Sequence, residues 1–86
     1  MARVLMYTTA ICPYCNNAKK LLAQKGVTVE ELRIDREPQL RQEMMDKSGQ
    51  RTVPQIWIGA THVGGFTDLW DLDRAGKLDP LLAQAE

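Results

Sequence analysis

The side chains with the clearest chemical potential are the two cysteines of Cys12-Pro13-Tyr14-Cys15, the only cysteines in the 86 residues. This segment follows a hydrophobic run and precedes a stretch with helical spacing of apolar residues, so Cys12 is expected at an exposed helix N-terminus. Unpaired backbone N–H groups and the helix dipole stabilise a thiolate there and lower its pKa from about 8.5. Cys15 lies three residues further along, on the same helix face and within reach of a disulfide. The pair therefore predicts reversible thiol-disulfide chemistry.

Length, composition and charge restrict the setting in which these cysteines work. With 86 residues, of which 44% are hydrophobic and 26% charged, the chain is predicted to form one small domain over residues 1–86. Its 11 basic residues balance 11 acidic ones, so no net field attracts nucleic acid or an anionic membrane. No apolar stretch approaches the roughly 20 residues of a membrane-spanning helix, and the first residues show no signal-peptide core. We expect a monomeric cytoplasmic protein, without nucleic-acid or membrane partners.

A cytoplasmic setting favours reactive over structural thiols. Cellular reductants keep ordinary cysteines reduced there, so an isolated Cys-x-x-Cys pair is more often catalytic or metal-binding than a structural disulfide. Two cysteines cannot complete a zinc site within one chain, so no metal is expected. Unreactive buried thiols, or half of a metal site shared between chains, remain as alternatives.

The hydrophobic pattern predicts the elements that hold the cysteines in place. Val4–Tyr7 is a continuous apolar run, typical of a central strand buried on both faces. Pro13 suits the first position of the following helix, with Cys12 as its N-cap. The pair Glu30-Glu31 interrupts the alternation of the second strand, which indicates an edge strand or a bulge. In chain order we expect strands at 4–7, 27–34, 55–58 and 61–63, helices at 13–25 and 38–47, a helix capped by Thr67 and ended by Gly76, and a short helix from Asp79-Pro80 through Leu82.

This β-α-β-α-β-β-α order predicts the architecture. The first β-α-β unit is expected to be right-handed, and Gly59-Ala60 gives a two-residue link between two antiparallel strands. Together they form a four-stranded mixed sheet flanked by helices, which is the thioredoxin-like α/β fold. A Cys-x-x-Cys motif beside a β-α-β unit is typical of redox proteins with that fold.

Three motifs, in this order and spacing, resemble those of the dithiol glutaredoxins. They are Cys12-Pro13-Tyr14-Cys15, Thr52-Val53-Pro54 and Gly64-Gly65-Phe66-Thr67-Asp68, and the similarity continues to Leu78-Asp79-Pro80-Leu81-Leu82. It covers essentially the whole chain and is greatest to the small bacterial glutaredoxin 3 type. The resemblance implies a glutathione-dependent thiol-disulfide oxidoreductase, with glutathione as co-substrate and glutathionylated or disulfide-containing proteins as partners.

The resemblance also implies the roles of the two cysteines. Cys12 would attack a glutathione mixed disulfide and be cleared by a second glutathione, whereas with protein disulfides Cys15 would resolve the intermediate. Two other functions stay open: an iron-sulfur carrier in which two chains and two glutathiones bridge a cluster, and a redoxin recharged by thioredoxin reductase. Pro13 argues mildly against the cluster carrier, and anion sites for glutathione argue against the reductase.

Glutathione binding is expected on Thr52-Val53-Pro54 and beside Tyr14. By resemblance Pro54 is cis, which exposes the backbone of Val53 so that its N–H and C=O can pair with the extended tripeptide as an added strand does. A proline here could otherwise simply open a strand. Tyr14 is expected to pack beside the tripeptide, or to form a fixed hydrophobic lid.

Each carboxylate of glutathione needs an anion site. By resemblance Gly65, Thr67 and Asp68 bind the γ-glutamyl end, because glycine permits close approach, the helix N-terminus attracts the carboxylate and Asp68 meets the ammonium group. Arg51 and Arg41 match family positions that hold the glycine carboxylate. Thr67 could also be a plain N-cap, and surface arginines often have no specific partner.

The remaining conspicuous side chains are interpreted as structural. His62 falls in a hairpin strand away from the cysteines, which favours a surface or packed histidine over a catalytic base. Trp57 and Trp70 are assigned to packing, and Met44 and Met45 to the inner side of the second helix.

Thr9 departs from the family pattern, in which many members carry lysine three residues before the nucleophile. Without that cation, the pKa of the Cys12 thiol should be lowered less than in lysine-bearing relatives, and Thr9→Lys should raise glutathione-dependent turnover at neutral pH. The rate of thiol alkylation against pH measures this. A pKa near that of a free thiol would contradict the expectation.

Overall fold

The computed structural model describes residues 3–84, so residues 1–2 and 85–86 of the predicted domain lie outside the described residues. The strands are β1 (Val4–Thr8), β2 (Val29–Arg33), β3 (Gln55–Ile58) and β4 (Thr61–Gly64), and the helices are α1 (Pro13–Gln24), α2 (Pro38–Ser48), α3 (Phe66–Arg74) and α4 (Leu78–Ala83). The sheet order is β2-β1-β3-β4, with β1 parallel to β2 and the other neighbours antiparallel. The predicted thioredoxin-like fold is confirmed. Within residues 3–84, no helix is both long and apolar enough to cross a membrane.

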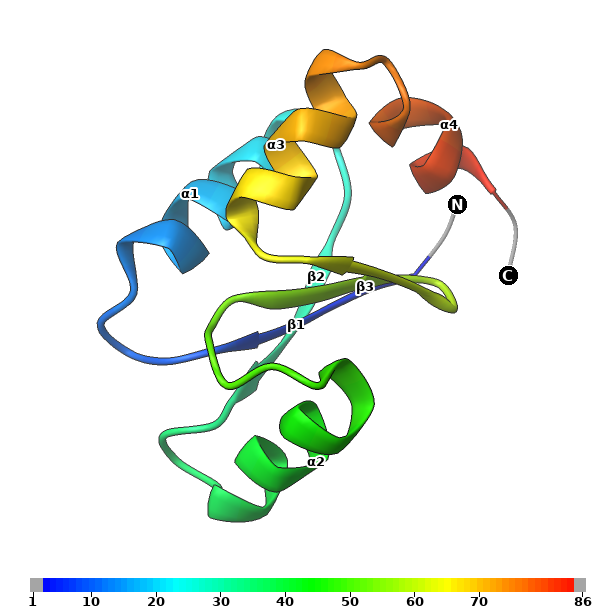
Figure 1. The fold of residues 1–86 in the computed structure, drawn as a ribbon. Helices are drawn as coiled ribbons and strands as arrows, with labels where there is room; N and C mark the ends of the chain where they lie inside the picture. Colours follow the sequence, from blue (N-terminus) through cyan, green and yellow to red (C-terminus); the bar gives the residue numbers. More distant parts are fainter. Residues whose placement is uncertain (1–2, 85–86) are drawn as a thin grey trace.

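The sheet separates two layers of helices, as Figure 1 shows, with α1, α3 and α4 on one face and α2 on the other. A separate hydrophobic cluster packs on each face. Strand alternation produces this division: Val4 and Met6 of β1 join the core with α1 and α3, whereas Tyr7 faces Met44 of α2. β1 is buried nearly throughout and lies between two strands, as its apolar run predicts.

Polar contacts from Tyr7 fasten α2 to the sheet. The Tyr7 hydroxyl is fully buried, donates to the Glu43 carboxylate (2.5 Å) and accepts from Nζ of Lys47 (3.3 Å). Burial, and secondarily the Glu43 carboxylate, raise the pKa of Tyr7 well above its ordinary value. The ammonium of Lys47 also lies 4.8 Å from the ring centroid of Trp57, a cation-π contact.

The second strand is shorter than predicted. β2 spans only Val29–Arg33 and lies at the edge of the sheet, which explains why it tolerates Glu30-Glu31. Val27 and Ile34, which were expected within the strand, are buried beside it. The irregularity in the ladder falls instead between β3 and β4, at Ile56/Trp57.

The N-cap predicted for α3 was wrong. The N-cap is Gly65, not Thr67, and the Asp68 side chain three residues on accepts the Gly65 N–H (3.0 Å). Gly64 has φ +111°, and a Cβ there would collide with the Asp68 carboxylate, so glycine is required for this return contact.

Two smaller expectations also change. α4 begins at Leu78, ahead of the expected start, because Pro80 falls in the first turn, where a missing N–H costs no helical hydrogen bond. Met44 is buried as predicted, and Trp57 is also buried. Trp70 is 44% exposed and does not pack into the core. The guanidinium carbon of Arg74 lies 4.6 Å from the centroid of its ring, a cation-π contact.

Candidate active site

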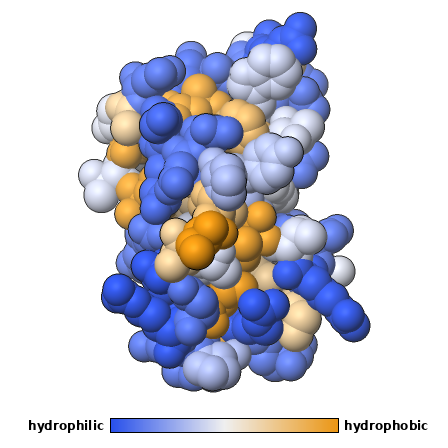
Figure 2. All heavy atoms as spheres, turned by 90° about the vertical axis from the view of Figure 1, so that its left-hand side faces the viewer, coloured by the Kyte–Doolittle hydropathy of each residue, from blue (hydrophilic) through white to orange (hydrophobic). Residues whose placement is uncertain are grey.

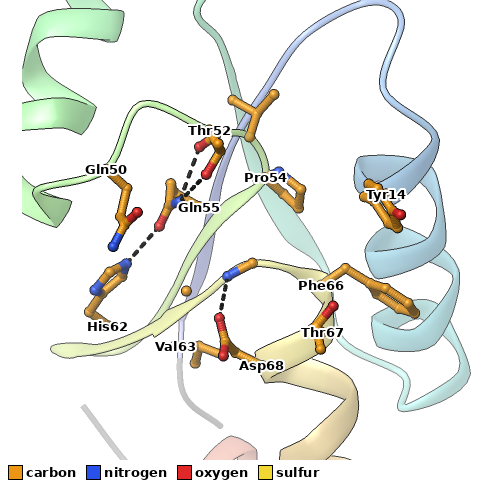
Figure 3. Close-up of a pocket in the computed structure, with 13 residues that line it drawn as sticks. Tyr14, Gln50, Thr52, Pro54, Gln55, His62, Val63, Phe66, Thr67 and Asp68 are labelled. Carbon is orange, nitrogen blue, oxygen red and sulfur yellow. Dashed lines mark hydrogen bonds between the residues drawn. The ribbon is translucent and has the colours of Figure 1, made fainter.

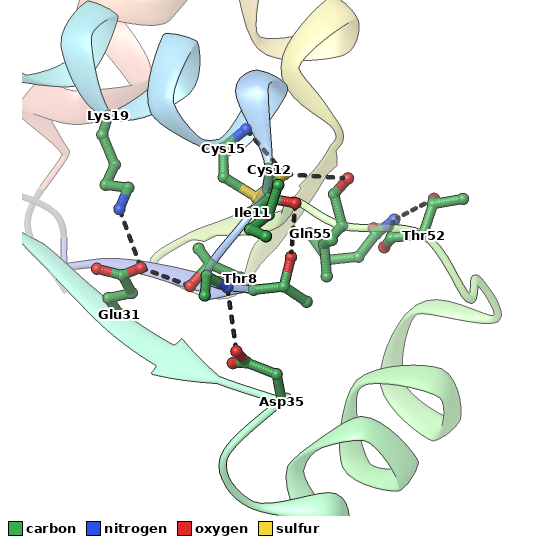
Figure 4. Close-up of a disulfide and its surroundings, with 12 residues drawn as sticks. Thr8, Ile11, Cys12, Cys15, Lys19, Glu31, Asp35, Thr52 and Gln55 are labelled. Carbon is green, nitrogen blue, oxygen red and sulfur yellow. Dashed lines mark hydrogen bonds and ion pairs between the residues drawn. A yellow bond between two sulfur atoms is a disulfide. The ribbon is translucent and has the colours of Figure 1, made fainter.

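The two cysteines lie at the start of α1, after the loop that follows β1, and they form a disulfide in this structure (Figure 4). Cys12 is the N-cap of α1, its sulfur accepting the Cys15 N–H at 3.1 Å, and Pro13 occupies the first helical turn. The N-terminal position predicted for Cys12 is thus confirmed. Its exposure is lower than expected, at 7%, but Cys15 is more enclosed still, at 1%. An incoming nucleophile or disulfide therefore reaches Cys12 more easily than Cys15.

The loop that leads to Cys12 is held by a carboxylate from the chain after β2. Asp35 accepts the Ala10 N–H (3.1 Å) and is paired with the guanidinium of Arg33 through two bonds of 2.8 and 2.7 Å. The Arg33 guanidinium holds the pKa of Asp35 well below its usual range. Asp35 is thus ionised at neutral pH and remains an acceptor for the loop.

A second carboxylate joins β1, β2 and α1 behind the cysteines. Glu31 accepts from the buried hydroxyl of Thr8 (2.5 Å) and from the ammonium of Lys19 (3.0 Å), as Figure 4 shows. The Thr8 hydrogen bond, followed by Lys19, lowers the pKa of Glu31. The three groups fix the end of β1 against the helix that carries Cys12.

A groove of about 560 Å³ runs beside the cysteines (Figure 3). Its walls come from the first turn of α1, the segment before β3, strand β4 and the start of α3. The lining residues are Tyr14, Gln50, Thr52, Val53, Pro54, Gln55, His62, Val63, Gly64, Gly65, Phe66, Thr67 and Asp68. The groove thus collects seven of the residues that the sequence nominated for ligand binding: Tyr14, Thr52, Val53, Pro54, Gly65, Thr67 and Asp68.

Val53 connects the groove to the cysteines. The Val53–Pro54 peptide bond is cis, as the resemblance implied. The carbonyl oxygen of Val53 lies 3.8 Å from Sγ of Cys12, and since a disulfide sulfur carries no hydrogen, this is a contact and not a hydrogen bond. On the other side, a Cβ at Gly65 would lie only 3.6 Å from the Pro54 carbonyl oxygen. The start of α3 therefore lies against the backbone of Pro54, the residue that follows Val53.

The groove combines an apolar wall with a helix N-terminus. The rings of Tyr14 and Phe66 stack with their centroids 6.4 Å apart, and Tyr14 is 61% exposed. The first N–H groups of α3, near Thr67, have no partners within the helix and favour an anion, while Asp68 beside them offers a negative charge to a cation. This arrangement suits a ligand with both a carboxylate and an ammonium group.

The two nominated arginines do not line the groove. Arg41 lies on α2 and Arg51 in the segment after it, and both side chains are exposed. A role in holding a ligand would require their side chains to swing toward it, so their assignment stays a prediction.

The groove also contains residues that the sequence reasoning did not select, namely Gln50, Gln55, His62, Val63, Gly64 and Phe66. For two of them, Gln55 and His62, the sequence contained a feature that could have indicated the site. Gln55 is a polar residue opening an otherwise apolar strand, directly after Pro54, and it is 2% exposed. The two-residue link places His62 opposite Trp57, whose ring it stacks on at 4.5 Å. His62 was expected away from the site, yet it forms part of the groove wall.

Ile11 stands out on the surface around the cysteines. Directly before Cys12, its side chain is 93% exposed, the largest exposure among the big hydrophobic residues described. Figure 2 shows this side of the molecule, with hydrophobic side chains gathered in its middle and hydrophilic ones around them. A large apolar side chain this exposed next to a reactive sulfur is a candidate contact for another molecule.

We predict that Glu31→Gln destabilises the fold by about 1 kcal/mol at neutral pH, because it weakens two charged hydrogen bonds of a partly exposed group. The pKa of Glu31 is lower in the fold than its ordinary value of 4.5, so this contribution is present above about pH 4.5 and disappears as the pH falls below it. Urea unfolding of both proteins between pH 7 and pH 3 measures it. Glu30→Gln, which removes only an exposed ion pair with Arg3, is the control and should have the smaller effect. A difference that grew on acidification would contradict the prediction.

Comparison with known proteins agrees with this geometry. A family model described as Glutaredoxin matches residues 4–63. The glutaredoxin of Pseudomonas aeruginosa is 59% identical over 96% of this chain and 99% of its own length, and glutaredoxin 3 of Escherichia coli is 55% identical over 95% and 99%. A crystal structure of a buckwheat glutaredoxin-glutathione complex superposes with a TM-score of 0.87 at 32% identity, over 94% of this chain and 76% of that one. The chain belongs to the glutaredoxin family.

Proposed function

We propose that Cys12 is the attacking thiol of a glutathione-dependent thiol-disulfide oxidoreductase and that the groove beside it binds the glutathionyl group. The overall activity follows from membership of the glutaredoxin family together with a Cys12–Cys15 pair that closes a disulfide. The observation that carries the assignment of roles is the Cys15 N–H aimed at Sγ of Cys12, at 3.1 Å. The same N–H would stabilise a Cys12 thiolate.

With a glutathionylated protein, the Cys12 thiolate attacks the glutathione sulfur. A Cys12-glutathione disulfide forms, the protein-glutathione disulfide breaks, and the protein leaves as a thiolate that takes up a proton. A second glutathione thiolate then attacks the glutathione sulfur on Cys12, which releases oxidised glutathione and regenerates the Cys12 thiolate. In the net reaction one glutathione thiol is consumed for each protein thiol produced, because the other half of the oxidised glutathione is the glutathionyl group taken from the protein.

With a protein disulfide, the Cys12 thiolate attacks one of its sulfurs and displaces the other as a thiolate. The Cys15 thiolate next attacks Sγ of Cys12, which frees the second protein thiol and closes the Cys12–Cys15 disulfide. The geometry suits this step because the two Cα atoms are 5.2 Å apart. Two glutathione thiols then reduce that disulfide.

The proposed glutathione position follows from the groove. The backbone of Val53, whose carbonyl lies 3.8 Å from the Cys12 sulfur, pairs with the cysteinyl residue as an added strand would. The γ-glutamyl carboxylate meets the N-terminus of α3 near Gly65 and Thr67, and its ammonium group meets Asp68. A solved buckwheat glutaredoxin complex with glutathione supports this choice of ligand. Arg41 and Arg51 remain the proposed contacts of the glycine carboxylate, after side-chain rearrangement.

Glutathionylated substrate proteins are proposed to approach over Ile11. Because its side chain is 93% exposed beside the reactive sulfur, a protein delivered to Cys12 must contact it. Ile11 does not line the groove, so a small disulfide bound there should depend less on this side chain.

We further propose that the protein acts as a monomer in the cytoplasm. The balanced charge of 11 basic and 11 acidic residues supports the absence of nucleic-acid and membrane partners. In the cytoplasm the glutathione pool is available as the electron donor.

The division of labour between the cysteines is tested with Cys12→Ser and Cys15→Ser. Cys12→Ser should reduce all activity to the background rate, while Cys15→Ser should retain deglutathionylation and lose glutathione-driven reduction of protein disulfides. A coupled assay with glutathione, its reductase and either a glutathionylated peptide or a peptide disulfide measures both reactions. Equal loss of both reactions in Cys15→Ser would refute the assignment.

Replacement of Ile11 tests the route of protein substrates. Ile11→Ser should lower kcat/KM for a glutathionylated protein about tenfold, since it removes an apolar contact at the interface. It should leave kcat/KM for a glutathione-cysteine mixed disulfide within about twofold. The matched control is Ala10→Ser, an exposed neighbour with little apolar surface. An equal effect of Ile11→Ser on both substrates would contradict a docking role.

A further inference from the structure

His62 is connected to the groove backbone through a chain of hydrogen bonds. It is the single histidine of the chain, lies on β4 opposite Trp57 and lines the groove. Its Nε2 lies 2.8 Å from Oε1 of Gln55. The amide nitrogen of Gln55 in turn donates to the carbonyl oxygen of Thr52 at 3.0 Å and to its hydroxyl at 3.3 Å. Figure 3 shows the three side chains in this sequence along one wall.

Donors and acceptors can be assigned to these hydrogen bonds in only one way. The Thr52 carbonyl can only accept, so the amide nitrogen of Gln55 must face it, and Oε1 of Gln55 must face His62. Because Oε1 can also only accept, Nε2 of His62 must carry the proton. Gln55 is 2% exposed, and His62 is the only described side chain that pairs with its Oε1. The stack of the His62 ring on Trp57, 4.5 Å between centroids, fixes the plane in which that N–H points.

The last acceptor of this series of hydrogen bonds, the Thr52 carbonyl, belongs to the backbone next to the reactive sulfur. The Thr52 carbonyl and the Val53 N–H belong to one planar peptide unit, so holding the carbonyl also sets the direction of the N–H. The carbonyl of the same Val53 lies 3.8 Å from Sγ of Cys12. If the Thr52–Val53 peptide unit rotated, the Val53 N–H would point away from a ligand attached to that sulfur.

We propose that His62 is a positioning residue for the glutathionyl group: through Gln55 and the Thr52 carbonyl, it aims the Val53 N–H at the cysteinyl carbonyl of the ligand. The inference rests on the proposed function, in that the ligand is the one assigned to the groove. His62 touches neither reacting sulfur. Its contribution is therefore to binding and not to the chemical step.

The kinetic experiment compares His62→Phe, which keeps a ring to stack on Trp57 but removes the donor, with His62→Gln, whose amide restores a donor at similar reach. His62→Phe should raise KM for a glutathionylated peptide about tenfold with kcat within about twofold, and His62→Gln should recover most of that loss. The control Thr61→Ala changes the preceding residue of β4, which does not line the groove, and should behave as wild type.

A second substrate separates positioning from general damage. The reaction of the reduced protein with a small aromatic disulfide that lacks peptide groups requires Cys12 but no pairing with Val53. His62→Phe should leave this rate within about twofold. An unchanged KM for the glutathionylated peptide, or an equal loss with both disulfides, would overturn the proposal.

An NMR measurement keeps the inference testable whether or not His62→Phe folds. In the wild-type protein, the ¹⁵N shifts of the His62 ring should show the proton on Nε2, and addition of reduced glutathione should shift the Val53 amide. A proton on Nδ1 would overturn the chain of hydrogen bonds. A wild-type protein that failed to reduce the glutathionylated peptide would refute the proposed function instead, and the His62 tautomer would still decide the hydrogen-bond chain.

Discussion

The structure depends on one helix N-terminus, that of α1, being capped by a sulfur. Cys12 occupies the position that serine, threonine, aspartate or asparagine usually fills, and its Sγ receives the Cys15 N–H at 3.1 Å. An N-cap acceptor that can ionise is stabilised as an anion by the groups it caps. The same contact therefore begins the helix, prepares the nucleophile and holds the second cysteine one turn away.

Contacts elsewhere in the fold hold that N-terminus beside the binding groove. Asp35 fixes the loop through Ala10, and Glu31 fixes the end of β1 to α1 through Thr8 and Lys19. On the opposite side, the start of α3 is closed by Asp68 on Gly65 and stands against the backbone around Pro54. Two helix N-termini from separate parts of the chain thus meet across a groove of about 560 Å³, one serving a thiolate and the other suited to a carboxylate.

The sequence predicted much of this because the relevant signals are local. Apolar periodicity gave the order of strands and helices, and Pro13 after Cys12 marked the sulfur-capped helix. The errors arose where a tertiary contact competes with a local preference. Thr67 is a good cap by type, but the carboxylate of Asp68 reaches back to Gly65, so α3 starts earlier. Trp70 is large and apolar, yet its position on α3 leaves it 44% exposed against Arg74.

The groove was only partly predictable for the same reason. Motif residues such as Val53 and Asp68 were identified by resemblance, whereas His62 and Gln55 meet in the groove through the pairing of β3 with β4, for which the only sequence signals were the position of Gln55 after Pro54 and the two-residue link between the strands. The exposure of Cys12 was overestimated, because a helix N-terminus says nothing about neighbours such as Val53, whose carbonyl approaches the sulfur to 3.8 Å.

We infer that the sulfur at the N-cap of α1 is the one that takes up glutathione. Reduced wild-type protein can be mixed with a glutathionylated peptide, quenched with acid before the second step, digested and mapped by tandem mass spectrometry. We expect glutathione attached to Cys12 and the peptide released as a free thiol. Glutathione found on Cys15, or the peptide itself joined to the protein, would contradict it.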